Sequence, residues 1–126
     1  MLIAYADDDI DDFSIVSETL AEIDSRTRCI NAMNGQEMLN LLENLTVLPD
    51  VILLDINMPY MDGMSCLRAI RANTRFEGVP VYMYTNGKNP VDEAHCRALG
   101  ATDYIVKHFS HDDMRHFFQG LVKKYA

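Results

Sequence analysis

The sequence of 126 residues contains no tryptophan, only three cysteines and no long apolar run. Cys29, Cys66 and Cys96 are odd in number, lie far apart and form no CxxC pair, which argues against a disulfide framework and against a zinc site. No apolar segment approaches the roughly 20 residues that span a bilayer, and the first residues show no charged-then-apolar leader pattern. These absences predict a cytoplasmic protein with reduced thiols and no membrane contact.

Basic residues are also scarce. Lysine and arginine number 11 against 19 aspartates and glutamates, so the formal net charge is -8. A surface that binds nucleic acid non-specifically must neutralise phosphates with lysine and arginine, so this balance argues against a nucleic-acid partner. Hydrophobic residues make up 48% of the chain, which is enough for a packed core. The length fits one domain over residues 1–126.

Short apolar segments alternate with segments whose apolar residues recur every three or four positions. This alternation predicts five strands, each followed by a helix. The strands are expected at residues 2–6, 28–32, 51–54, 79–84 and 104–106. They are apolar throughout, as expected where helices cover both faces of a parallel sheet. The pattern therefore predicts a doubly wound α/β fold with a five-stranded parallel sheet, in the flavodoxin-like strand order 2-1-3-4-5.

Several residues mark the ends of the expected helices. Gly100 is placed to end the fourth helix in the left-handed conformation. Ser110 begins a capping box before the last helix, with aspartate in place of the usual glutamate. Asp9, Asp11 and Asp12 are interpreted as acids that the dipole favours at the start of the first helix. The histidines show no metal-binding spacing and are interpreted as surface residues: His95, His108, His111 and His116.

Polar residues stand where the expected strands end: Asp7–Asp9, Asp55, Thr85 and Lys107. The carboxyl ends of parallel strands meet at one edge of a sheet, and ligands bind there at the point where the strand order reverses. In the expected order this switch point lies between the first and the third strand. Several carboxylates, a hydroxyl and an ammonium are therefore expected to share one small site.

This set of groups indicates phosphoryl chemistry. Neighbouring carboxylates repel one another unless a cation joins them, and oxygen ligands favour Mg²⁺. A bound Mg²⁺ polarises a phosphoryl oxygen, and a carboxylate can attack phosphorus to give an acyl phosphate. Lys107 supplies a positive charge and Thr85 a hydroxyl donor for the phosphoryl oxygens. The site is therefore predicted to accept a phosphoryl group.

Four motifs resemble those of the receiver domain of two-component response regulators, and the resemblance covers essentially the whole chain. The motifs are Ala6–Asp9, the loop Asp55–Gly63 (DINMPYMDG), the turn at Thr85 and the segment Tyr104–Lys107 (YIVK). Their order is the one that the family shows, and four motifs in order are a specific signal. The resemblance implies that Asp55 is the phosphorylated nucleophile.

The resemblance also implies roles for the other groups. Asp7 and Asp8 become an acidic pocket for Mg²⁺, with Asp8 nearer the metal. Asp55 and the backbone carbonyl of Asn57 become further ligands. Thr85 and Lys107 contact the phosphoryl group. Thr85 also forms the switch, together with the rotating aromatic Tyr104.

A chain of this kind is expected to act as a stand-alone, chemotaxis-type response regulator. It would receive the phosphoryl group from a histidine kinase or a histidine phosphotransfer protein and would catalyse its own phosphorylation and dephosphorylation. It is not expected to be an enzyme with a separate substrate, and its downstream protein target is unknown.

Two other functions stay open. A haloacid-dehalogenase-type phosphatase also uses an aspartate nucleophile and Mg²⁺, but its motif needs a second aspartate where this chain has Asn57. A phosphorylation-independent binding module would form no acyl phosphate with any donor.

Three residues depart from the family pattern. Asn86 follows Thr85, where receivers usually have alanine, serine or glycine, and Gly87 offers no side chain to orient an attacking water. His108 follows Lys107 in place of the usual proline. A cis peptide costs about 2.5–4 kcal/mol before a residue other than proline, so this bond is expected to be trans.

Overall fold

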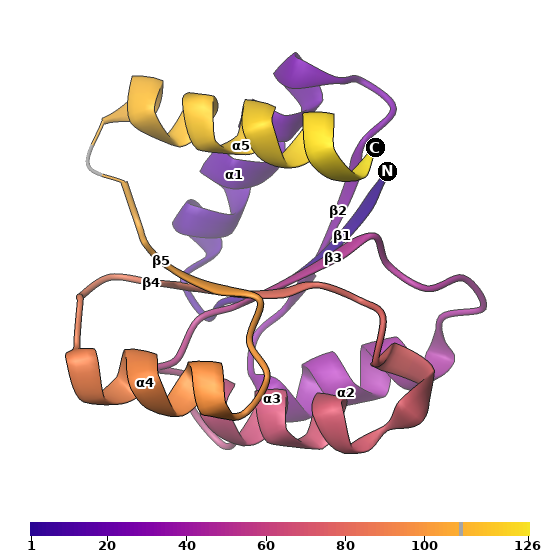
Figure 1. The fold of residues 1–126 in the computed structure, drawn as a ribbon. Helices are drawn as coiled ribbons and strands as arrows, with labels where there is room; N and C mark the ends of the chain where they lie inside the picture. Colours follow the sequence, from indigo (N-terminus) through magenta and orange to yellow (C-terminus); the bar gives the residue numbers. More distant parts are fainter. Residues whose placement is uncertain (109) are drawn as a thin grey trace.

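The computed structural model of the chain describes residues 1–108 and 110–126 (Figure 1). Within them, five parallel strands form one sheet in the order β2-β1-β3-β4-β5, as predicted. The strands are β1 (Leu2–Ala6), β2 (Arg28–Ala32), β3 (Val51–Leu54), β4 (Val81–Thr85) and β5 (Asp103–Val106). The helices are α1 (Ile10–Ile23), α2 (Gly35–Asn44), α3 (Gly63–Ala72), α4 (Pro90–Ala98) and α5 (His111–Tyr125). The sequence pattern did not predict the short 3₁₀ helix η1 (Thr74–Phe76).

Helices cover both faces of the sheet, with α1 and α5 on one face and α2, α3 and α4 on the other (Figure 1). Side chains alternate between the two faces along each strand. Val51 and Leu53 of β3 belong to the buried cluster with α1 and α5, whereas Ile52 and Leu54 belong to the cluster with α2, α3 and α4. Because both faces of β3 are buried, the strand has no polar side. The predicted doubly wound α/β fold is confirmed.

The boundaries of two strands differ from the prediction. β4 begins at Val81 rather than at residue 79, because the Val79 N–H donates to the carbonyl of Phe76 at 3.0 Å in the preceding turn. Pro80 has no N–H to offer to the sheet. β4 also runs one residue further than expected, to Thr85, so the threonine belongs to the sheet itself. β5 starts one residue earlier than expected.

The local signals at helix ends are confirmed. Gly100 has a φ angle of 101° and follows α4 in the left-handed conformation. Ser110 caps α5, because its hydroxyl accepts the N–H of Asp113 at 3.1 Å. No peptide bond in residues 1–108 and 110–126 is cis, so the bond between Lys107 and His108 is trans, as predicted.

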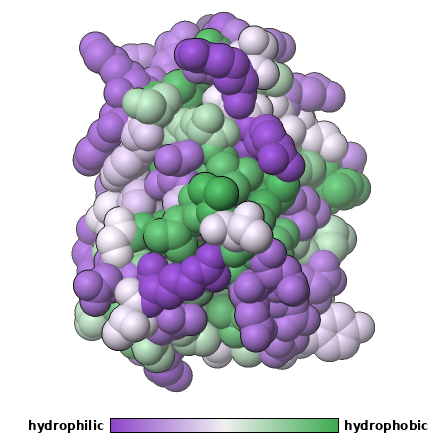
Figure 2. All heavy atoms as spheres, turned by 90° about the vertical axis from the view of Figure 1, so that its right-hand side faces the viewer, coloured by the Kyte–Doolittle hydropathy of each residue, from purple (hydrophilic) through white to green (hydrophobic). Residues whose placement is uncertain are grey.

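Figure 2 shows the side of the molecule where both termini and the α2–β3 connection lie. Apolar side chains gather in the middle of this face, with hydrophilic ones around them. Val47 and Leu48, in the α2–β3 connection, are 68% and 41% exposed. The carboxyl ends of the strands lie at the opposite edge of the sheet (Figure 1). In the described part of the chain, no helix combines the length and the apolar character that crossing a membrane requires.

The three cysteines, Cys29, Cys66 and Cys96, carry free thiols, as expected. Cys66 and Cys96 are buried, and Cys29 is partly buried. Burial raises the pKa of the Cys66 thiol to about 12, so this thiol is protonated and unreactive at neutral pH.

Candidate functional site

The polar residues expected at the strand ends lie together at the carboxyl edge of the sheet. Asp7 follows β1 and Asp55 follows β3, and the register of these strands pairs Ala6 with Leu54. The two aspartates therefore leave neighbouring strands side by side. The helices that follow β1 and β3 cover opposite faces (Figure 1). The edge between β1 and β3 is thus the switch point, where ligands of doubly wound sheets bind.

The carboxylate of Asp55 is held on both of its oxygens. Oδ1 accepts the hydroxyl of Thr85 at 2.9 Å, and Oδ2 accepts the ammonium of Lys107 at 3.2 Å. The Asp55 N–H donates to the Ala6 carbonyl at 3.0 Å, which ties the residue to β1. Asp55 is only 5% exposed. The structure therefore brings together the carboxylate, the hydroxyl and the ammonium that the sequence predicted at one site.

The start of α3 packs closely against the backbone of Asp55. Asp62 caps this helix, because its Oδ1 accepts the N–H of Ser65 at 2.8 Å. A Cβ atom on Gly63 would lie 2.1 Å from the carbonyl oxygen of Asp55, a distance at which atoms overlap. Glycine is therefore required here, and the last two residues of the DINMPYMDG loop serve the turn into α3.

Three carboxylates form a group that could hold a metal ion. Asp7, Asp8 and Asp55 each offer an oxygen, and these oxygens all lie within 4.8 Å of one another. Asp7 is fully buried, while Asp8 is exposed. Asn57 and Asn86 line the same open depression. A cluster of hard oxygen donors open to solvent on one side fits Mg²⁺, which usually keeps several waters.

Lys107 is bound by three carboxylates. Its Nζ lies 2.6 Å from Oδ2 of Asp7, 2.8 Å from Oδ2 of Asp12 and 3.2 Å from Oδ2 of Asp55. Burial lowers the pKa of Lys107, but the hydrogen bonds to Asp12 and Asp7 outweigh it, so that the pKa is raised above its ordinary value. Lys107 therefore stays an ammonium, with each of its three donors matched to a carboxylate.

Asp12 belongs to the site, although the sequence pattern marked it only as an acid at a helix start. That interpretation is correct for Asp9, whose Oδ1 accepts the N–H groups of Asp11 and Asp12 at 3.0 and 3.2 Å. Asp12 lies in the first turn as expected, but its side chain also reaches Lys107. No sequence signal gives this contact, because it depends on where folding places the first turn of α1 relative to the lysine that follows β5.

Tyr5 is the second residue that sequence reasoning missed. It belongs to the apolar strand expected at residues 2–6, where an aromatic side chain is typical of the core. It is fully buried, and its hydroxyl donates to Oδ2 of Asp7 at 2.6 Å. Burial raises the pKa of Tyr5, and the Asp7 carboxylate raises it further. The signal was present: residues two apart on a strand share one face, so Tyr5 points the same way as Asp7.

Tyr104 lies beside the loop that follows Thr85. Its hydroxyl donates to the carbonyl of Gly87 at 2.9 Å, and the residue is buried. Burial raises the pKa of Tyr104, so its hydroxyl stays a donor. Because Gly87 is two residues beyond Thr85, the tyrosine and the threonine hydroxyl are linked through one short loop segment.

His108 is not the surface residue that the sequence suggested. It is partly buried, with its ring centroid 5.4 Å from that of Phe117 and 6.2 Å from that of Tyr84. The imidazole fills space between β4 and α5, so the position after Lys107 contributes to packing. The other three histidines are exposed, as predicted: His95, His111 and His116.

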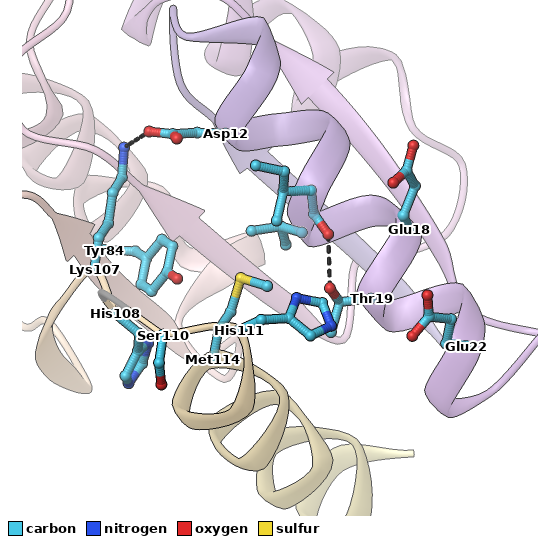
Figure 3. A pocket seen from close by; sticks show the side chains of 12 residues that line it. Asp12, Glu18, Thr19, Glu22, Tyr84, Lys107, His108, Ser110, His111 and Met114 are labelled. Atoms are coloured by element: carbon cyan, nitrogen blue, oxygen red, sulfur yellow. Dashed lines mark hydrogen bonds and ion pairs between the residues drawn. The ribbon is translucent and has the colours of Figure 1, made fainter.

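A second hollow, a groove between α1 and α5, adjoins the site (Figure 3). The pair of Asp12 and Lys107 stands at one end of this groove. Glu18 and Glu22 line it from α1, and Met114 lines it from α5. Lys107 borders both the groove and the open depression at Asp55, so the two hollows meet at the lysine.

Comparisons with known proteins agree with this geometry. The chain matches the family model described as "Response regulator receiver domain" over residues 3–119. It is 31% identical over 109 residues to "Sensor histidine kinase CheAY" of Helicobacter pylori, which covers 86% of this chain and 13% of that protein. The curated relatives matched first are longer proteins, of which the chain spans 13–35%.

Solved structures give the same match. The chemotaxis response regulator CheY4 of Vibrio cholerae superposes with a TM-score of 0.81 at 28% identity, covering 95% of this chain and 97% of that chain. The Mn²⁺-bound form of response regulator Rcp1 superposes with a TM-score of 0.84 at 26% identity, and the match covers 95% of this chain and 90% of that chain.

Proposed function

This chain belongs to the family of response regulator receiver domains, and we propose that it accepts a phosphoryl group on Asp55 in a Mg²⁺-dependent reaction. One observation carries the assignment of the acceptor. Asp55 is a buried carboxylate that contacts a hydroxyl through one oxygen and an ammonium through the other, and it also belongs to the acidic group. Asp7 and Asp8 belong to the acidic group, but among the described residues the Thr85 hydroxyl donates to Asp55 and to neither of them.

The donor is proposed to be the phosphohistidine of a histidine kinase or of a histidine phosphotransfer protein. An Asp55 carboxylate oxygen attacks the phosphorus, the new O–P bond forms, and the P–N bond to the imidazole breaks. The departing imidazole nitrogen takes a proton from water. Hydrolysis then returns the carboxylate: a water oxygen attacks the phosphorus, the O–P bond to Asp55 breaks, and inorganic phosphate leaves.

The neighbouring side chains stabilise the charge that moves onto the phosphoryl oxygens. Lys107 and Thr85 already donate to the Asp55 oxygens, and both can turn to the transferred group without moving far. Mg²⁺, held by Asp7, Asp8, Asp55 and the backbone carbonyl of Asn57, would offset the carboxylate charges and polarise a phosphoryl oxygen. Phosphoryl transfer needs little else from the protein than this positioning.

The signal is proposed to leave the site through Thr85 and Tyr104. When the Thr85 hydroxyl leaves Oδ1 of Asp55 for a phosphoryl oxygen, the loop that contains Gly87 moves with it. Tyr104 donates to the Gly87 carbonyl, so a movement of this loop changes the position of the tyrosine ring. A changed surface around this loop would then be recognised by a downstream protein. The chain is proposed to act in this way as a phosphorylation-dependent regulator in the cytoplasm.

The phosphatase alternative has no support from the comparisons, and Asn57 stands where its motif needs an aspartate. The binding-module alternative predicts that no acyl phosphate forms. Incubation with acetyl phosphate and Mg²⁺, followed by intact mass spectrometry, separates the phosphoacceptor from the binding module. The wild-type protein should gain the mass of one phosphoryl group, and chelation of Mg²⁺ with EDTA should abolish the gain.

Two variants make this test specific. Asp55→Asn should gain nothing, because it keeps the shape and loses the nucleophile. Asp62→Asn is the matched control: it also removes one carboxylate of the DINMPYMDG loop, but asparagine caps a helix as well as aspartate does. A gain of equal yield in Asp55→Asn would show that another residue is the acceptor.

A further inference from the structure

Tyr5 brings a buried hydroxyl to the acidic group from inside the protein. Its side chain is fully buried and belongs to the cluster between the sheet and helices α1 and α5. The ring centroid lies 6.2 Å from that of Phe13 and 5.9 Å from that of Tyr84. With aromatic neighbours from α1 and from β4, the ring has little room to turn, so the direction of its hydroxyl is set by the core.

The hydroxyl donates to Asp7, a candidate metal ligand, and not to another core residue. It donates to Oδ2 of Asp7 at 2.6 Å, and the same oxygen accepts Lys107 at 2.6 Å. The other oxygen, Oδ1, accepts the N–H of Asp9 at 2.9 Å. An ionised carboxylate offers about four acceptor positions. Three of these positions are filled, so the Asp7 carboxylate has little freedom to rotate. One acceptor position stays open.

The three partners of Asp7 differ in what they can do during the reaction. Lys107 is expected to turn toward the transferred phosphoryl group. The Asp9 N–H belongs to the residue that caps α1, and it donates only to Oδ1 of Asp7. The Tyr5 hydroxyl is uncharged, buried and fixed by its ring, so it is the donor on Oδ2 that stays in place when the lysine moves.

We propose that Tyr5 is a positioning residue, whose hydroxyl holds the Asp7 carboxylate in the orientation that binds the divalent cation. The inference rests on the Mg²⁺ site of the proposed function and adds to it a residue that touches neither metal nor phosphoryl group. Donors behind a metal-binding carboxylate orient it, and their removal typically lowers metal affinity by about 10–100-fold. A tyrosine that merely filled the core would have no such effect.

The test compares Tyr5→Phe with a matched control. The substitution keeps the ring and its packing and removes only the hydroxyl. Tyr82→Phe removes another hydroxyl on the same face of the sheet, one that pairs with the hydroxyl of Tyr125 at 2.8 Å instead of with a carboxylate. Mg²⁺ alone is titrated into each folded protein by calorimetry, and thermal melts without Mg²⁺ record any loss of stability.

Tyr5→Phe should raise the Mg²⁺ dissociation constant by about 10–100-fold, and Tyr82→Phe should leave it unchanged. In labelling with acetyl phosphate, Tyr5→Phe should need correspondingly more Mg²⁺ for half-maximal rate, while the rate at saturating Mg²⁺ stays close to that of the wild type. Equal Mg²⁺ affinities in Tyr5→Phe and wild type would overturn the positioning role but would leave Asp55 as acceptor. A wild type that binds no Mg²⁺ would overturn both this inference and the metal site of the proposed function.

A second measurement on the unmodified protein does not depend on the folding of Tyr5→Phe. The chain has six tyrosines and no tryptophan, so its near-ultraviolet spectrum reports tyrosine environments. Mg²⁺ binding at Asp7 should perturb the hydrogen-bonded Tyr5 and give a difference spectrum in the wild type and in Tyr82→Phe. A Mg²⁺-bound wild type with no tyrosine difference signal would contradict the proposal.

Discussion

The ammonium of Lys107 lies 2.8 Å from Oδ2 of Asp12, so the lysine after β5 is bound by an acid from the first turn of α1. Asp12 differs from the other two partners of this lysine, because it lies outside the acidic group that fits Mg²⁺. It can therefore hold Lys107 in place while Asp7 and Asp55 serve the metal.

Asp12→Asn is expected to weaken Mg²⁺ binding and leave the fold intact. Without Asp12, Lys107 relies on Asp7 and Asp55 and competes with the cation for their oxygens. Calorimetric titration should show the dissociation constant raised by roughly tenfold, which corresponds to about 1.4 kcal/mol. Asp11→Asn is the control, since it removes the same charge from the same helical turn at a residue that makes no ion pair with Lys107 within the described ranges. Equal shifts from both variants would mean that net charge alone matters.

Gly63→Ala is expected to destabilise the fold, because the new Cβ would overlap the Asp55 carbonyl oxygen at the start of α3. Overpacking of this kind costs about 1–3 kcal/mol. In Gly120→Ala, in α5, the new Cβ meets no atom of residues 1–108 and 110–126 outside its own helix within 4 Å, and the change should stabilise the protein by about 1 kcal/mol, because alanine favours helix. Urea unfolding measures both free energies. A neutral Gly63→Ala would show that α3 can move away from Asp55 without cost.

Asn86→Ala is expected to speed phosphorylation by small donors. Asn86 is exposed and lines the depression beside Asp55, so its side chain narrows the approach to the nucleophile. Time courses with acetyl phosphate at saturating Mg²⁺ measure the rate. Asn44→Ala, at the exposed end of α2, serves as the control. A rate that is unchanged or lower in Asn86→Ala would mean that the amide does not obstruct the donor, or that it assists the reaction.

Mg²⁺ is expected to stabilise the folded chain, since the acidic group is assembled only by folding. At about a hundred times its dissociation constant the ion adds roughly 2.7 kcal/mol to the free energy of unfolding. Thermal melts with and without Mg²⁺ should show this gain in the wild type and in Asp11→Ala, and its loss in Asp8→Ala. The same gain in Asp8→Ala would place the metal elsewhere.

The position of the site followed from the sequence because it depends on topology. Once the alternation of apolar segments indicates five parallel strands, the strand ends must meet at one edge, and the residues that follow them must lie close together. The contact of Thr85 with Asp55 required only that both residues stand at neighbouring strand ends. The caps at Gly100 and Ser110 followed from local chemistry alone.

The contacts that the sequence did not predict depend on packing between elements. Asp12 reaches Lys107 because folding brings the first turn of α1 close to the residue that follows β5, and no sequence spacing predicts that arrangement. His108 is partly buried because α5 places Phe117 against it. Tyr5 is different, since its spacing from Asp7 put both side chains on one face. It was missed because an aromatic residue in a buried strand is usually read as core.

Localising the phosphate on the chain tests the proposed function most directly. After incubation with acetyl phosphate and Mg²⁺, borohydride reduces an aspartyl phosphate to homoserine, and peptide mass spectrometry identifies the position. The proposed mechanism predicts homoserine at residue 55 of the wild type and none in Asp55→Asn. Homoserine at Asp7 or Asp8, or an unmodified wild-type chain under conditions where Mg²⁺ is bound, would contradict it.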